Sequence, residues 1–194
     1  RLTNENLMFE VEKGKYSITT DPFIVASQIQ PSAYISFLSG LYLLGLTDQV
    51  INTIQVVSAR RRKGLVFENV SIEFVHFPST LMFGYTKIRK ENSYIMVGEP
   101  EKIILDFMYK PGEFGISYAV EAMRTGLNIG KIENFLLRVN KEAVLARTGY
   151  LLEKLGSKID LHRTNNTVYK LNPRSMVKGK FDSKWGLMVN EVLN

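Results

Sequence analysis

Apolar and polar residues follow two different periods along this chain, and the change of period separates a β-rich middle from a helical second half. Runs of β-branched and aromatic residues predict strands in the middle, at 53–58, 70–77, 85–89 and 94–97. From residue 99 the apolar positions recur at helical spacing and predict helices over 99–110, 117–124, 131–138 and 141–155. Short strands at 167–171 and 185–189 end the pattern. These elements predict an α+β fold in which a mixed β-sheet packs against helices.

Two helices are predicted before the β-rich region. Asp21 can cap a helix whose first position is Pro22, and this helix should run to Gln28. A second helix should begin near Pro31, because apolar residues then follow at helical spacing and Gly45 can end it. That apolar stripe consists of Tyr34, Phe37, Leu38, Leu41 and Tyr42. From the helical faces we expect a buried core that includes Phe37, Leu41, Ile103, Phe107 and Leu151.

The chain starts with a short hairpin pattern. Apolar residues at 7–11 and 16–18 flank the charged turn Glu12-Lys13-Gly14-Lys15. A two-stranded hairpin is marginally stable alone, so we expect it to pack on a segment upstream of Arg1. The absence of an initial Met fits this expectation, and roughly 60 to 90 helical residues would suffice for a small domain there.

Composition excludes several classes of protein and site. The chain has 194 residues, of which 45% are hydrophobic and 23% are charged, unlike a disordered chain. It has no Cys and only two His, at positions 76 and 162, which excludes disulfides and thiolate sites and makes a His-rich metal site improbable. No apolar run approaches the roughly 18 residues of a membrane span, and no signal peptide is apparent. We therefore expect a cytoplasmic protein without a membrane partner.

Positive charge gathers in two places. The loop Arg60-Arg61-Arg62-Lys63 joins two predicted strands, and four adjacent cations repel one another without helping the fold. Between Lys154 and Lys184 lie eight basic residues opposed only by two Asp, and this stretch accounts for the net charge of +6. Such patches attract nucleic acid or acidic partners, although a solvated lysine-rich edge is an equally good interpretation. Trp185 within the stretch is expected in the core, with base stacking as the alternative.

No motif supports an enzyme. The segment 40–47 has the spacing of a phosphate-binding P-loop, but Leu46 occupies the position of its essential Lys. A nucleotidyltransferase would need a second carboxylate beside Asp160, and none follows Gly156-Ser157 closely. Asp160 and Asp182-Ser183-Lys184 could form a metal-nuclease pattern, so a metal-dependent nuclease or nucleotidyltransferase-like enzyme remains the alternative. His76 fits a half-buried strand residue better than a base. We expect no catalytic, cofactor or metal site.

An ordered series of motifs resembles the C-terminal domain of AbiEi-family antitoxins, which belong to type IV toxin–antitoxin (abortive infection) systems. Residues 34–46 resemble the helix that opens that domain, and Phe74-Val75-His76 precedes Phe83-Gly84. Residues 98–106 resemble the acidic-Pro-Glu-Lys helix start of the family. The closing motifs are residues 147–156, Leu171-Asn172-Pro173 and Trp185-Gly186-Leu187. The resemblance covers roughly residues 21–190.

The resemblance implies a function and a domain division. Members carry an N-terminal winged helix that binds DNA, so residues 1–20 would be the remnant of its wing and residues 21–194 the antitoxin domain. The implied protein is a non-catalytic antitoxin that represses its own operon and counteracts a nucleotidyltransferase-like toxin, with no cofactor or small-molecule substrate. A DNA-binding regulator with a sensor domain and no toxin is a further alternative.

Two groups of basic residues are the candidate binding sites. Phosphate contacts to DNA are expected from the hairpin turn and the four-cation loop, namely Lys13, Lys15, Arg60, Arg61, Arg62 and Lys63. Contacts to the partner toxin are expected from Lys178, Lys180 and Lys184.

Overall fold

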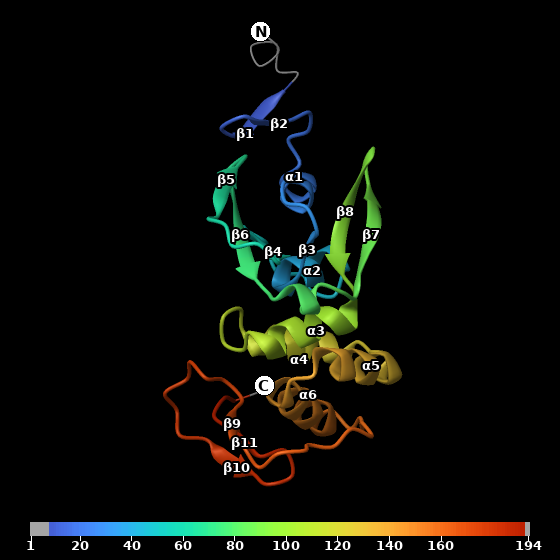
Figure 1. Ribbon diagram of the computed structural model, residues 1–194, viewed down its shortest axis with the longest axis vertical. Coiled ribbons are helices and arrows are strands. Elements are labelled where there is room, and N and C mark those ends of the chain that lie inside the picture. Colours follow the sequence, from blue (N-terminus) through green and yellow to red (C-terminus); the bar gives the residue numbers. More distant parts are fainter. Residues whose placement is uncertain (1–7, 193–194) are drawn as a thin grey trace. The chain divides into compact units, whose positions relative to one another are not determined.

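The computed structural model describes residues 8–192 and has an α+β fold (Figure 1). The chain divides into two compact units. The first comprises the residues up to Leu43 together with Gln49–Gly98, and the second comprises Leu44–Asp48 together with the chain from Glu99 onward. This division rests on where contacts within the chain are concentrated. That residues 1–20 are the remnant of a winged-helix domain stays a prediction.

The first unit is built on a six-stranded mixed sheet with the strand order β5-β6-β4-β3-β8-β7. β4 pairs with β6 in parallel and with β3 antiparallel, while β3 pairs with β8 in parallel. Each edge is the outer strand of an antiparallel hairpin, β5 with β6 and β7 with β8. The strands are β3 (Ala33–Ile35), β4 (Thr53–Ser58), β5 (Leu65–Phe67), β6 (Val70–His76), β7 (Tyr85–Lys90) and β8 (Ser93–Gly98). The expected strands of the β-rich middle are therefore confirmed.

The helix α1 (Pro22–Gln28) has the bounds that the sequence predicts. The Asp21 carboxylate accepts hydrogen bonds from the amides of Phe23 and Ile24, at 2.8 and 3.2 Å. The helix packs across β3, β4 and β8 (Figure 1), and its apolar residues share one core with those strands. A short 3₁₀ turn, η1 (Ser79–Leu81), follows β6.

The helix predicted to begin near Pro31 is wrong at its start. Tyr34 lies in β3, which is completely buried between β4 and β8, and helix α2 (Phe37–Leu43) begins only afterwards. Pairing with strands on both sides outweighs the helical spacing that Tyr34 happens to share with the apolar residues of α2. Phe37 has a left-handed φ of 53°, which makes the sharp turn from strand to helix.

A hairpin of β1 (Phe9–Glu12) and β2 (Lys15–Ser17) confirms the expected strands at this end of the chain, although Leu7 lies outside the described residues. Phe9 and Val11 pack against the core of the six-stranded sheet. The hairpin is therefore supported by the first unit itself, where the sequence led us to expect support from an upstream segment.

The second unit contains four helices within one residue or two of the predicted ones: α3 (Pro100–Tyr109), α4 (Ile116–Arg124), α5 (Ile129–Val139) and α6 (Glu142–Lys154). The central helix α3 contacts each of the other three. Lys102 and Asp106, one turn apart on α3, form a buried ion pair. Arg147 of α6 donates to the carbonyl of Met108 at 3.0 Å, which places a cation on the C-terminal end of α3. Burial lowers the pKa of Arg147 to about 10, so it stays charged at neutral pH.

A three-stranded sheet in the order β10-β11-β9 completes the second unit. Its strands are β9 (Tyr169–Lys170), β10 (Lys180–Asp182) and β11 (Leu187–Val189). Trp185 attaches this sheet to α6: its indole lies against Gly149, and its Nε1 donates to Glu153 at 2.6 Å. Trp185 is 3% exposed, which confirms the expectation that it belongs to the core.

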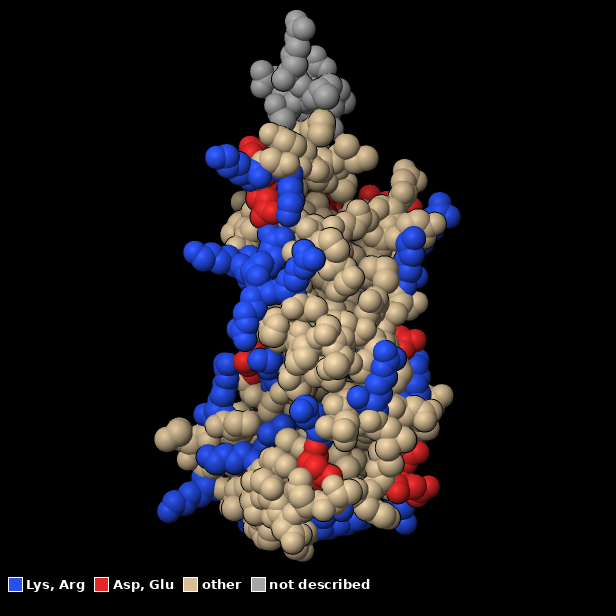
Figure 2. Space-filling model, in the orientation of Figure 1, with Lys and Arg blue, Asp and Glu red and all other residues tan. Residues whose placement is uncertain are grey.

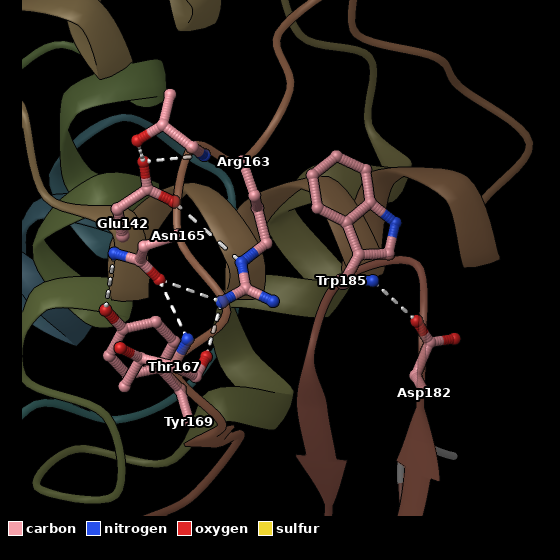
Figure 3. Close-up of polar contacts among 8 residues, drawn as sticks. Glu142, Arg163, Asn165, Thr167, Tyr169, Asp182 and Trp185 are labelled. Atoms are coloured by element: carbon pink, nitrogen blue, oxygen red, sulfur yellow. Dashed lines mark hydrogen bonds and ion pairs between the residues drawn. The ribbon is translucent and has the colours of Figure 1, made fainter.

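The segment that leads into β9 is held by Arg163. Its guanidinium donates to the side-chain oxygen of Asn165 at 3.1 Å and to the carbonyl of Thr167, and it lies 3.8 Å from the Glu142 carboxylate (Figure 3). Figure 3 also shows the Asp182 carboxylate accepting from the Trp185 amide, at 2.8 Å. Within residues 8–192, no helix is long and apolar enough to cross a membrane.

Candidate nucleic-acid interface

The structure brings together the hairpin turn and the four-cation loop, which the sequence places about 50 residues apart. The connection is Glu12 of β1, whose carboxylate lies 2.7 Å from Lys15 and 2.6 Å from Arg62. One acidic side chain thus joins a cation of the hairpin to a cation of the loop. Both predicted groups of phosphate contacts lie in the first unit, and we refer to them together as the hairpin–loop surface: Lys13, Lys15, Arg60, Arg61, Arg62 and Lys63.

Arg62 is the cation of this surface with the most contacts. Its guanidinium lies 4.3 Å from the ring centre of Phe74 in β6, and its side chain is 15% exposed. The hydrogen bond from Lys15, assisted by the charges of Arg62 and Lys15, holds the pKa of Glu12 below its usual value, although burial raises it in part. Glu12 is therefore ionised at neutral pH and neutralises part of the surface.

The remaining cations of the hairpin–loop surface point to solvent. Lys13, Arg60, Arg61 and Lys63 are exposed, and none of them has an ion-pair partner among residues 8–192. The loop itself is fixed at its start, because the Ser58 hydroxyl accepts from the Arg60 amide and donates to its carbonyl, both at 3.1 Å. Figure 2 shows Lys and Arg side chains gathered where the hairpin and β5 lie, with acidic side chains among them. Such a surface can hold phosphates without reading bases.

Sequence reasoning missed the part that Glu12 plays. It treated the acid as one residue of a charged turn, whereas the structure makes it the link between two basic segments. Its position at the end of a strand, close to Lys13 and Lys15, was the available signal, but the partner 50 residues away was not visible.

The second predicted group, Lys178, Lys180 and Lys184, lies in the second unit. Its members differ in whether they form an ion pair. Lys184 forms an ion pair with Glu153 and lies 5.5 Å from the Trp185 ring, so it helps to attach the small sheet to α6. Lys178 and Lys180 are exposed and have no ion-pair partner in the part of the chain that the structure describes.

Of the alternative metal site, the structure engages the Asp182 carboxylate but only the backbone amide of Asp160. The Asp182 carboxylate caps the turn before Trp185, and the backbone amide of exposed Asp160 donates to Glu133 at 2.5 Å. His76 ends β6 and is half-buried. Within 8–192, no group of three or more His, Asp or Glu side chains has the arrangement of a metal site.

The fold and this surface define an α+β protein with an exposed basic patch on its first unit, the one built on the six-stranded sheet. No family model matches the chain, and no curated protein matches it. Among solved structures, the chain is similar to the RV2827C protein from Mycobacterium tuberculosis, with a TM-score of 0.62 and 15% identity. The match covers 95% of this chain and 78% of that one. At this identity the likeness concerns the fold alone.

Proposed function

We propose that this chain is part of a non-catalytic antitoxin and transcriptional autoregulator that acts in the cytoplasm. It binds the phosphate backbone of its operator DNA through the hairpin–loop surface and counteracts a nucleotidyltransferase-like toxin. The observation that carries the DNA-binding part is the convergence of the hairpin turn and the four-cation loop, with Lys13, Arg60, Arg61 and Lys63 exposed. The ordered motifs that resemble AbiEi-family antitoxins support the toxin-directed part.

Folding does not account for these four cations. Exposed like charges on adjacent residues repel one another, and the contacts that order the loop come instead from Ser58 and Arg62. A polyanion removes the repulsion, and the released counterions supply the free energy of binding.

The DNA-binding part is tested with R60Q/R61Q/K63Q, which leaves the structurally engaged Arg62 in place. We expect weaker binding to operator and random duplexes by a similar factor, measured by fluorescence anisotropy at about 50 and 200 mM salt. The salt dependence should become shallower, by up to about 2.7 in slope if all three cations contact phosphates. The matched control, K141Q/K158Q/K170Q, removes three exposed lysines of the second unit and should bind as the wild type does. Equal affinity of wild type and R60Q/R61Q/K63Q at both salts would overturn the DNA-binding part.

The antitoxin part is tested by growth rescue. Co-expression with a nucleotidyltransferase-like protein encoded beside this one should restore growth of cells that the toxin arrests. Absence of rescue, or of any such neighbouring gene, would contradict this part. Magnesium-dependent nuclease or nucleotidyltransferase activity of the purified protein that is lost in D160N or D182N would favour the enzymatic alternative instead.

A further inference from the structure

The second unit contains an open hollow of about 800 Å³. Its walls come from the C-terminal end of α6, the loop between β9 and β10, β10 itself and the residues that follow β11. Four cations line it, opposed by the two carboxylates of Asp182 and Glu191: Lys154, Arg174, Lys178 and Lys180. The hollow is therefore basic overall.

Three of these cations are available to a ligand. Arg174 already pairs with Glu113 at 2.7 Å, whereas Lys154 rests over the ring of Tyr150 at 5.6 Å from its centre. Lys154, Lys178 and Lys180 are exposed and have no carboxylate partner within residues 8–192. Carboxylates of a ligand could pair with all three.

Large apolar side chains stand between these cations. Val177 is 65% exposed and Phe181 is 56% exposed, and both line the hollow. Met176, next to Val177, is 95% exposed. Exposed apolar side chains grouped within a polar rim are typical of protein-binding sites.

The hollow also borders an open strand edge. β10 pairs with β11 on one side, with Phe181 opposite Met188, and no strand of the described chain pairs with its other side. An extended peptide can add to such an edge through main-chain hydrogen bonds, while alternate side chains enter neighbouring pockets.

One buried acceptor distinguishes between polypeptide and nucleic acid. Glu191 Oε2 is shielded from solvent and has no hydrogen-bond partner in the described part of the chain. A peptide offers an N–H donor at nearly every residue, whereas a phosphodiester backbone offers none and nucleic acid has N–H donors only on its bases. Together with the exposed aliphatic side chains, this favours a polypeptide.

We propose that this hollow binds an acidic segment of a partner protein in an extended conformation along β10. Carboxylates of the segment pair with Lys178 and Lys180, and an apolar side chain packs on Val177 and Phe181. The inference rests on the proposed antitoxin function for the identity of the partner and deepens it by naming the chemistry of the docking segment.

The test uses random peptides of roughly 12 residues displayed on phage and selected on the whole protein. We expect the enriched peptides to be rich in Asp and Glu with apolar residues interspersed. One enriched peptide, synthesised with a fluorophore, should bind K178E/K180E at least roughly tenfold more weakly than wild type. F181A, which keeps every charge, should also weaken binding several-fold. The control K141E/K158E makes the same change in net charge outside the hollow and should retain the wild-type affinity.

Enrichment of neutral or basic peptides, or equal binding by wild type and K178E/K180E, would overturn the inference. The inference would also be overturned if a single-stranded oligonucleotide bound in a manner that depends on Lys178 and Lys180 while no peptide did, because the ligand would then be nucleic acid. Circular dichroism of each variant shows whether it is folded. Failure of the wild type to bind DNA or to rescue growth from the toxin bears on the proposed function alone. The proposed function and the peptide-binding inference can therefore fail separately.

Discussion

Gly149 is the residue that allows the Trp185 indole to pack against helix α6 in the second unit. A Cβ atom at this position would lie 2.1 Å from the Trp185 ring, inside its van der Waals radius. A helix interior ordinarily disfavours glycine relative to alanine, so the glycine is retained against its propensity because the indole occupies the space. The same close approach carries the hydrogen bond from Trp185 to Glu153.

We expect Gly149→Ala to destabilise the protein by about 1 to 3 kcal/mol, the usual cost of overpacking a core. Gly130→Ala is the matched control, because its Cβ would meet nothing closer than 3.6 Å, and helix propensity alone predicts a gain of up to about 1 kcal/mol. Urea unfolding followed by tryptophan fluorescence gives both values. A Gly149→Ala protein as stable as wild type would show that Trp185 does not lie against this helix.

At the scale of the element, α3 carries a buried ion pair between Lys102 and Asp106. Both side chains are 1% exposed. Burial lowers the pKa of Lys102 by more than the neighbouring carboxylate raises it. The pair belongs to the helix start by which the sequence resembles AbiEi-family antitoxins. Because both side chains are buried, the pair contributes to the packing of α3.

Removal of one partner should therefore cost far more than removal of both. Asp106→Leu removes the carboxylate that faces a buried ammonium, and we expect a loss of about 3 to 5 kcal/mol in unfolding free energy. Lys102→Met/Asp106→Leu should recover most of that loss, because both buried charges are then removed together. Denaturant melts of the two single variants and the double variant measure the coupling. Additive losses would contradict a coupled pair.

The contact of the small sheet with α6 should depend on pH. Hydrogen bonds from Lys184 and then Trp185 hold the pKa of Glu153 below its usual value. A carboxyl whose pKa is lower in the folded state stabilises the fold above its unfolded pKa, and this contribution disappears as the pH falls through the folded pKa. We expect wild-type stability to fall on acidification below about pH 4.5 more steeply than that of Glu153→Gln, measured by thermal melts. If the stability of wild type and Glu153→Gln changed in parallel with pH, ionised Glu153 would not be the group that stabilises this contact.

At the scale of the whole molecule, charge is unevenly distributed over the two units. The hairpin–loop surface lies in the first unit and the basic hollow in the second, and each contains acidic side chains that moderate it. Glu12 is the moderating residue of the first surface, since it pairs with both Lys15 and Arg62.

We therefore expect Glu12→Gln to tighten DNA binding, opposite in sign to the loss in R60Q/R61Q/K63Q. Release of about one cation to contact phosphate should steepen the dependence of log K on log salt by about 0.9. Gel shifts at several salt concentrations measure the slope. Glu10→Gln, an exposed acid on the same strand without an ion pair among the described residues, is the control and should change the slope less. Unchanged or weaker binding by Glu12→Gln would contradict phosphate binding at this surface.

The sequence by itself determined the elements whose signals are local. Asp21 and Pro22 place the start of α1, and the helices after residue 99 follow an apolar stripe, because capping and periodicity act over one or two turns. The expected core residues Phe37, Leu41, Ile103, Phe107 and Leu151 are all at most 1% exposed. The α+β class followed from these elements alone.

Tertiary structure alone decided what depends on distant partners. β3 is a strand because it has β4 and β8 beside it, although Tyr34 fits the helical stripe of the residues that follow. β5 and β10, which the sequence did not indicate, have three residues each, too few to show alternation. Glu68 and Asn69 turn β5 into β6 with positive φ angles, an unusual conformation for Glu. Likewise, sequence found the basic residues, but only the fold distinguishes Arg62 and Lys184, which pair with Glu12 and Glu153, from neighbours that have no ion pair among the described residues. Ion pairing depends on proximity in space.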